Sequence, residues 1–140
     1  MCLAGLLSGL RRGELVSLRP EDVDLERKTL RVESVYSKTG KGRTVPLGPR
    51  LQAVLKTALS IRAEAPVVFV TKAGKAWTVD AFTVGLHYYS KRVIDPIGPH
   101  VLRHTFASRL VMAGVDIRTV QELLGHADIT MTMRYAHLSP

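Results

Sequence analysis

Residues 100–137 read HVLRHTFASRLVMAGVDIRTVQELLGHADITMTMRYAH, and this stretch predicts helices separated by glycines. Apolar residues recur at helical spacing from His100 to Gly114, where a glycine at a helix C-terminus ends the first helix. Asp116 is a typical N-cap for a second helix, which we expect to end at Gly125. One or two further helical turns are predicted over 130–137. The residues predicted to face inward from the first two helices are Leu102, Phe106, Leu110, Ala113, Ile117, Val120 and Leu124.

The part of the chain before this stretch predicts both helices and short strands. Two helices are expected over 3–10 and 12–18, the second ended by Pro20. The alternating residues 29–35 and the segment 43–47 predict an antiparallel strand pair around a glycine-containing turn. The remaining predicted elements are a helix over 48–63, a short strand over 67–70 with 76–78 pairing back weakly, a helix capped by Asp80 and running to Val93, and a loop over 94–99.

The chain therefore predicts an α+β fold, mostly helical, with a small antiparallel β-sheet in its first half. We expect one domain over 1–140, since 140 residues with 46% apolar content can bury a core. The apolar runs fall short of the roughly 20 residues that cross a membrane. Apolar residues precede the basic ones at the N-terminus, the reverse of a secretory signal, and Cys2 is the single cysteine. These features predict a cytoplasmic protein without disulfides.

Positive charge is in excess, with 20 lysines and arginines against 12 acidic residues and a net charge of +8. A surplus of this size favours a polyanionic partner such as DNA or RNA. A basic surface that merely keeps the protein in solution explains the charge equally well. Charge alone does not decide between them.

Four residues near the C-terminus supply the groups needed for metal-free attack on a phosphodiester. Arg103 can grip a phosphate through two hydrogen bonds, His100 and His126 can move or donate a proton, and the Tyr135 hydroxyl can become a nucleophile. Each residue alone has an ordinary structural explanation. His126, for example, follows a helix C-terminus, which favours an imidazolium.

A metal site is the competing interpretation of His100 and His104, which are four residues apart. Zinc hydrolases with this spacing carry a glutamate between the ligands, which is absent here. Arg103 lies between the two histidines instead, and its charge would repel a cation. We therefore expect no metal.

Five separated motifs resemble the tyrosine recombinases, or phage-type integrases. In order they are SGLRRGEL (8–15), SKTGKGRTVPL (37–47), HVLRHTFAS (100–108), LLGHADITMT (123–132) and RYAH (134–137). The resemblance spans nearly the whole chain, with 23 residues from Arg103 to His126 and nine from His126 to Tyr135. It implies the catalytic-core fold of that family.

The resemblance assigns a role to each matching residue. Arg12 and Lys41 neighbour matched positions without being the match, His104 is expected to be structural, and His87 and His137 match nothing catalytic. The implied catalytic residues are Arg11, Lys38, His100, Arg103, His126 and the nucleophile Tyr135, with Glu14 in a supporting role.

The implied reaction is site-specific DNA recombination. Tyr135 would attack a phosphodiester of double-stranded DNA, forming a 3′-phosphotyrosine and releasing a 5′-hydroxyl. Arg11 and Arg103 would neutralise the phosphate, and His126 would donate a hydrogen bond to it. Lys38 would protonate the leaving oxygen and His100 would assist proton transfer at the tyrosine. No cofactor is implied, and the expected location is the cytoplasm, at the nucleoid.

Members of this family usually carry an N-terminal core-binding domain and a further segment after the nucleophile. We therefore expect residues 1–140 to be a catalytic domain truncated at both ends, without the core-binding domain. Leu3, Leu6 and Leu7 are expected to pack against another surface, for which a second copy of the chain is a candidate. We also expect the protein to form a dimer or tetramer on DNA. Alternatives are a truncated, inactive DNA-binding or interaction fragment of an integrase, and a type IB topoisomerase, against which the motifs at 100–108 and 123–128 argue.

Overall fold

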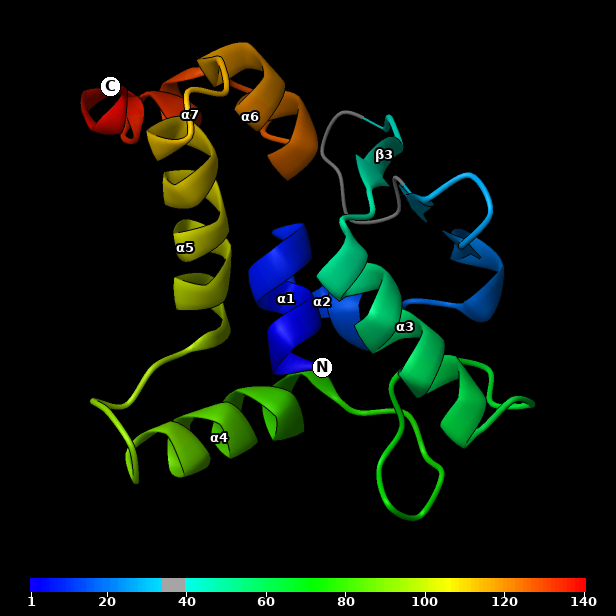
Figure 1. Cartoon of the computed structure of the whole chain (residues 1–140). Helices are drawn as coiled ribbons and strands as arrows, with labels where there is room; N and C mark the ends of the chain where they lie inside the picture. Colours follow the sequence, from blue (N-terminus) through cyan, green and yellow to red (C-terminus); the bar gives the residue numbers. More distant parts are fainter. Residues whose placement is uncertain (34–39) are drawn as a thin grey trace.

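The computed structural model describes residues 1–33 and 40–140. Its architecture is α+β, mostly helical with a small antiparallel sheet, as expected (Figure 1). No helix in these two ranges is long and apolar enough to cross a membrane. In chain order the elements are α1 (Cys2–Ser8), α2 (Arg12–Val16), η1 (Pro20–Asp22), β1 (Val23–Asp24), β2 (Thr29–Val32), β3 (Arg43–Pro46), α3 (Pro49–Ile61), α4 (Val79–Ser90), α5 (Pro99–Met112), α6 (Ile117–Leu124), α7 (Thr130–Met133) and η3 (Ala136–Leu138).

The sheet has the order β1-β2-β3, and both pairings are antiparallel. Leu30 pairs with Val45 and Val32 with Arg43, which confirms the predicted strand pair. The buried side chains Leu30, Val32 and Val45 lie at alternate positions along their strands, as expected when one sheet face covers a core. Part of the predicted strand 29–35 and the turn that holds Lys38 lie outside the described residues. The two-residue strand β1 was too short to predict.

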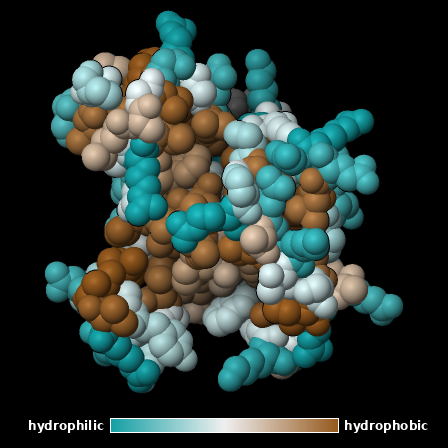
Figure 2. All heavy atoms as spheres, in the orientation of Figure 1, coloured by the Kyte–Doolittle hydropathy of each residue, from teal (hydrophilic) through white to brown (hydrophobic). Residues whose placement is uncertain are grey.

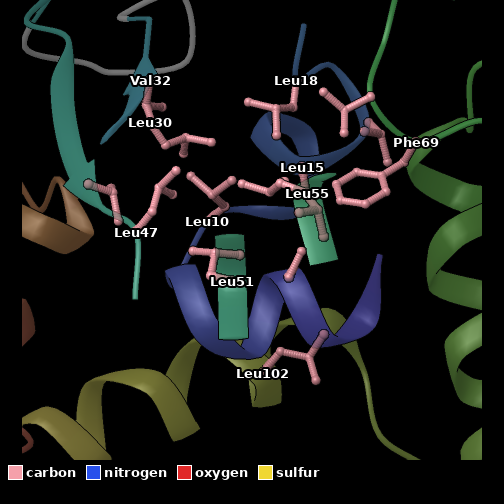
Figure 3. Packing of buried hydrophobic residues seen from close by; sticks show 14 of the residues in the cluster. Leu10, Leu15, Leu18, Leu30, Val32, Leu47, Leu51, Leu55, Phe69 and Leu102 are labelled. Carbon is pink, nitrogen blue, oxygen red and sulfur yellow. The ribbon is translucent and has the colours of Figure 1, made fainter. Parts of the chain in front are cut away.

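The main core lies between α1, α2, the inner face of the sheet and α3 (Figure 3). Leu15, Leu30 and Leu55 are almost fully buried there. Helix α5 joins this core through Leu102, whose Cδ1 lies 3.2 Å from the Cβ that an alanine at Gly5 would carry. The absence of a side chain at Gly5 therefore allows α1 and α5 to pack closely.

A second cluster joins α5 and α6 to the C-terminal segment. It consists of Ala107, Val111, Val120, Leu124 and Tyr135. The predicted burial of Leu102, Val120 and Leu124 is confirmed, and Phe106, Leu110 and Ile117 pack partly buried. Ala113 was wrongly predicted to be buried, because α5 ends at Met112 and Ala113 is an exposed C-cap.

Segment 67–70 is not the predicted strand. A single bridge pairs Val70 with Ala76, and the amide of Val68 donates to the Leu18 carbonyl at 2.8 Å instead of to a neighbouring strand. Val68 and Phe69 are still buried in the main core. The two residues are thus apolar and buried, but they belong to an irregular segment rather than to a strand.

The helix caps follow local side-chain chemistry. Asp116 accepts hydrogen bonds from the amides of Arg118 and Thr119, and Gly125 ends α6 in the left-handed conformation, as predicted. Asp80 was wrongly predicted as a cap, because the Thr78 hydroxyl accepts from the Ala81 amide and starts α4 two residues earlier. Helix α4 also ends at Ser90 rather than at Val93.

Apolar atoms gather in the middle and at the lower left of the face shown in Figure 2, and hydrophilic side chains lie between and around them. A groove of about 760 Å³ near the N-terminus is lined by residues of α1, α3, α4 and the segment between α3 and α4, including Leu3, Phe82 and Trp77. Leu3 is partly uncovered, as expected, whereas Leu6 and Leu7 pack against the main core of the chain itself.

Candidate active site

The C-terminal end of α6 binds arginines from three separate segments. The last carbonyls of a helix have no partner within it and carry partial negative charge, so guanidinium groups are suitable partners. The three bonds run from Arg43 Nε to Leu123 O (2.8 Å), from Arg103 Nη2 to Leu124 O (2.7 Å) and from Arg11 Nη2 to Gly125 O (2.7 Å). This helix end therefore fixes residues that lie far apart in sequence.

Arg11 is positioned by the turn between α1 and α2. Gly9 ends α1 at φ 65°, and a Cβ there would lie 2.3 Å from the ring of Phe106, so only glycine fits. The Gly9 carbonyl accepts from Arg103 Nη1 at 2.6 Å. Arg11 then caps α2: its amide donates to Glu14 Oε2 at 2.7 Å, and its Nη1 lies 3.0 Å from Glu14 Oε1. The turn thus brings both predicted arginines to one place.

Glu14 is a buried carboxylate held by Arg43. Arg43 Nη1 and Nη2 bind Glu14 Oε1 and Oε2 at 2.8 and 2.7 Å, a two-pronged arrangement that lysine could not reproduce. Burial raises the pKa of Glu14, but hydrogen bonds and charge from Arg43 and then Arg11 outweigh it and lower the pKa overall. Sequence reasoning assigned no role to Arg43, although it lies within the quoted motif 37–47.

Arg103 lies at the centre of the site, on the first half of α5. Burial, followed by the charge of Arg11, lowers the pKa of Arg103 to about 10, so it remains a cation near neutral pH. The three guanidiniums of Arg11, Arg43 and Arg103 against the one carboxylate of Glu14 leave a net charge of +2 (three minus one). A cluster with this surplus attracts an anion.

His126 follows Gly125 directly, so the left-handed end of α6 aims it at the arginines. Its Nδ1 lies 2.8 Å from Oγ1 of Thr132, which is fully buried. Burial, then the charges of Arg103 and Arg11, lowers the pKa of His126 to about 4. The expected preference for imidazolium at this helix end is therefore wrong, because burial and then the charges of the surrounding arginines favour the neutral ring.

Tyr135 lies between α7 and η3 and is 6% exposed. Its hydroxyl is hydrogen-bonded to Nδ1 of His104, with ring centroids 5.8 Å apart. His104, predicted to be structural, is thus in direct contact with the tyrosine oxygen. The sequence holds a sign of this position: His104 is one residue after Arg103 and one helical turn after His100, so it lies close to both on α5.

One pocket of about 250 Å³ collects most of the predicted site residues. Glu14 lies behind it, bound to Arg11 and Arg43, and Lys38 lies outside the described residues. The pocket is lined by Arg11, His100, Arg103, His104, His126, Met131, Arg134 and Tyr135. Cations, a neutral imidazole and a phenol therefore converge on a space that could hold one phosphate group.

Comparison with known proteins identifies the family of this chain. The model of the phage integrase family matches residues 1–140. The chain belongs to this family. Among curated family relatives, the tyrosine recombinase XerD of Ralstonia nicotianae is 40% identical over 141 residues, covering 94% of this chain and 45% of that protein. XerC of Thermodesulfovibrio yellowstonii is 38% identical over 144 residues, covering 94% and 46%. The chain spans about half the length of these relatives.

Solved structures of the phage integrase family share the fold. The XerA recombinase superposes with a TM-score of 0.84 at 31% identity, covering 98% of this chain and 52% of that chain. The catalytic domain of bacteriophage HP1 integrase gives a TM-score of 0.67 at 31% identity, covering 99% and 73%. The XerH recombinase, solved on its difH substrate before cleavage, gives 0.76 at 26%, covering 96% and 41%. The fold is therefore that of a tyrosine recombinase catalytic domain.

Proposed function

We propose that this chain is the catalytic domain of a site-specific tyrosine recombinase, comprising residues 1–140, that cleaves and rejoins double-stranded DNA. The observation that carries the proposal is the convergence of Arg11, Arg103, His126 and Tyr135 on one pocket of about 250 Å³. These residues come from the α1–α2 turn, from α5 and from the segment after α6. The similarity to recombinases along the whole chain supports the same function.

Arg11 and Arg103 would bind the non-bridging oxygens of the scissile phosphate. Each guanidinium carries five N–H donors, and backbone carbonyls and Glu14 occupy only part of them. Because those carbonyls hold the arginines in place, little reorganisation is needed when negative charge develops in the transition state. Glu14 would orient Arg11 from behind.

His126 would add a hydrogen bond from a neutral imidazole. If the Thr132 hydroxyl donates to Nδ1, the proton of the ring resides on Nε2, which is then the donor toward the phosphate. The low pKa of His126, about 4, favours this neutral form. A fixed tautomer suits a group that stabilises charge without taking part in proton transfer.

Tyr135 would be the nucleophile. Its oxygen attacks phosphorus, the bond to the 5′-oxygen breaks, and the DNA remains attached through a 3′-phosphotyrosine. Lys38 is the proposed acid for the leaving 5′-oxygen, and His100, in the first turn of α5, lines the same pocket. A 5′-hydroxyl reverses the reaction without an energy source, so no cofactor is required.

The proposed partner is double-stranded DNA, which fits the net charge of +8. The proposed location is the cytoplasm, at the nucleoid. We also propose a dimer or tetramer on DNA. Strand exchange requires two duplexes to be cut together, which needs more than one nucleophile.

A nicked suicide duplex tests the proposal, because loss of the short 5′-hydroxyl fragment traps the covalent complex. Duplexes that contain recombination sites of relatives, together with a randomised pool, should yield an adduct that survives denaturation. Tyr135→Phe should abolish it, whereas the matched change Tyr89→Phe, on an exposed tyrosine of α4, should not. Failure of all these duplexes to form an adduct at high protein concentration would favour the inactive-fragment alternative.

A further inference from the structure

His104 lies in the pocket but has no role in the reaction proposed above. It lies on α5 one turn after His100, and its Nδ1 is hydrogen-bonded to the Tyr135 hydroxyl. The rings of His100 and His104 meet edge to face at 6.0 Å. Within residues 1–33 and 40–140, no hydrogen bond joins His100 to Tyr135. The nucleophilic oxygen is therefore in contact with the second histidine of the pair.

The surroundings of His104 favour its neutral form. Burial, then the charges of Arg134, His100 and Arg103, lowers its pKa from the ordinary value of 6.5. Arg11 and His126 line the same pocket from the other elements that enclose it. A neutral imidazole has one nitrogen that accepts a hydrogen bond, and here Nδ1 is the nitrogen that faces the phenol.

We infer that His104 is the immediate acceptor of the Tyr135 proton during strand cleavage. This step deepens the proposed function and depends on it. As the Tyr135 oxygen forms its bond to phosphorus, its O–H bond breaks and the proton passes to His104 Nδ1. The P–O5′ bond breaks at the same time, and the 5′-oxygen takes a proton from the general acid, for which Lys38 is the candidate.

The charges around His104 also favour rejoining. Once protonated, its imidazolium stands close to Arg103, Arg134 and His100, which repel a further positive charge. The proton therefore returns readily to the tyrosine oxygen when a 5′-hydroxyl attacks the phosphotyrosine. The same histidine thus serves as base in cleavage and as acid in rejoining.

Single-turnover adduct formation on a suicide duplex tests this role. His104→Ala should slow the step by about 10²- to 10⁴-fold, the range for a lost general base, while DNA affinity stays within a few-fold. His104→Asn can still accept the phenolic hydrogen bond but cannot take the proton, so it should remain slow. The matched change His87→Ala, on an exposed histidine of α4, should have no effect.

The pH profile separates His104 from His100. In the wild type the rate should fall at acidic pH, as His104 becomes protonated, and because the pKa of His104 is lowered this fall should lie below the ordinary imidazole value of 6.5. His104→Asn should remove this acidic limb, whereas His100→Asn should keep it at a lower rate. An acidic limb that persists in His104→Asn and disappears in His100→Asn would overturn the inference and assign the proton to His100.

Two results distinguish the failure of this inference from that of the proposed function. If His104→Ala forms the adduct at the wild-type rate while Tyr135→Phe forms none, His104 is not the acceptor but the recombinase reaction stands. If the wild type forms no adduct at all, the proposed function fails and the step fails with it. Nitrogen NMR of folded wild type should also show the Nε2–H tautomer of His104, and an Nδ1–H tautomer would contradict the inference.

Discussion

Arg43 binds both carboxylate oxygens of Glu14, at 2.8 and 2.7 Å, across the gap between β3 and α2. A third donor of Arg43, its Nε, binds the Leu123 carbonyl at the end of α6. One side chain thus connects the sheet, the segment that carries Arg11 and the helix that precedes His126. Arg43 does not line the 250 Å³ pocket, but it anchors the segments that carry Arg11 and His126, which do line it.

Removal of Arg43 should destabilise the whole domain. Arg43→Met leaves the Glu14 carboxylate buried with Arg11 as its remaining partner, which typically costs about 3–5 kcal/mol. Adding Glu14→Gln should recover part of that loss, because the buried charge disappears. Urea unfolding measures both. Arg19→Met, which removes an exposed ion-pair network, should cost less than about 1 kcal/mol, and equal losses at the two arginines would contradict this account.

Gly9 should tolerate no side chain. Gly9→Ala forces a left-handed backbone on alanine, at about 1–2 kcal/mol, and adds a clash with the Phe106 ring at 2.3 Å. Gly48→Ala is a matched control, since a Cβ there meets nothing within 4 Å. Thermal unfolding should show a large loss at Gly9 and a change within about 1 kcal/mol at Gly48. Similar melting temperatures for the two variants would argue against the close contact of α1 with α5.

Thr132 should control the orientation of His126. Thr132→Val keeps the shape of the buried side chain but removes the hydroxyl 2.8 Å from Nδ1, so the imidazole loses its fixed tautomer. We expect slower adduct formation on a suicide duplex and a loss of stability of about 1–3 kcal/mol. Thr57→Val, at an exposed position of α3, controls for the change of residue type. Wild-type cleavage by Thr132→Val would show that the threonine does not position His126.

Stability should fall as the pH drops from 6.5 toward 4. The pKa of His126 is about 4 in the folded chain against 6.5 ordinarily, so the unfolded chain binds the proton more tightly in this range. The stabilisation is thus complete above pH 6.5 and is lost toward the folded-state pKa. His126→Gln should reduce the change of melting temperature with pH, and His87→Gln should leave it unaltered. Equal pH dependence in wild type and His126→Gln would contradict the low pKa.

Features that depend on nearby residues were predictable from sequence. Gly125 ends α6 and Asp116 begins it because glycine at a helix end and aspartate at an N-cap act within a few residues. The Asp80 cap failed because Thr78, equally suited by type, lies two residues earlier. The predicted strand at 67–70 failed because short apolar runs fit strands and buried irregular segments equally well.

The sequence predicted which residues line the candidate site, but not the hydrogen bonds that hold them in place. Family motifs named Arg11, Arg103 and Tyr135, and these lie around one pocket. Arg43 binds Glu14, which is 29 residues away in the sequence, and Arg103 binds the carbonyl of Leu124, which is 21 residues away. No local sequence pattern could reveal either bond. The contact of His104 with Tyr135 likewise spans 31 residues and depends on how the C-terminal segment packs on α5.

Identification of the amino acid that becomes attached to DNA tests the central claim most directly. The trapped complex from a suicide duplex would be digested with protease and nuclease, and the modified peptide sequenced by mass spectrometry. We expect a 3′-phosphodinucleotide on Tyr135 in the wild type and no adduct with Tyr135→Phe. Attachment at another residue, or through a 5′-phosphate, would contradict it.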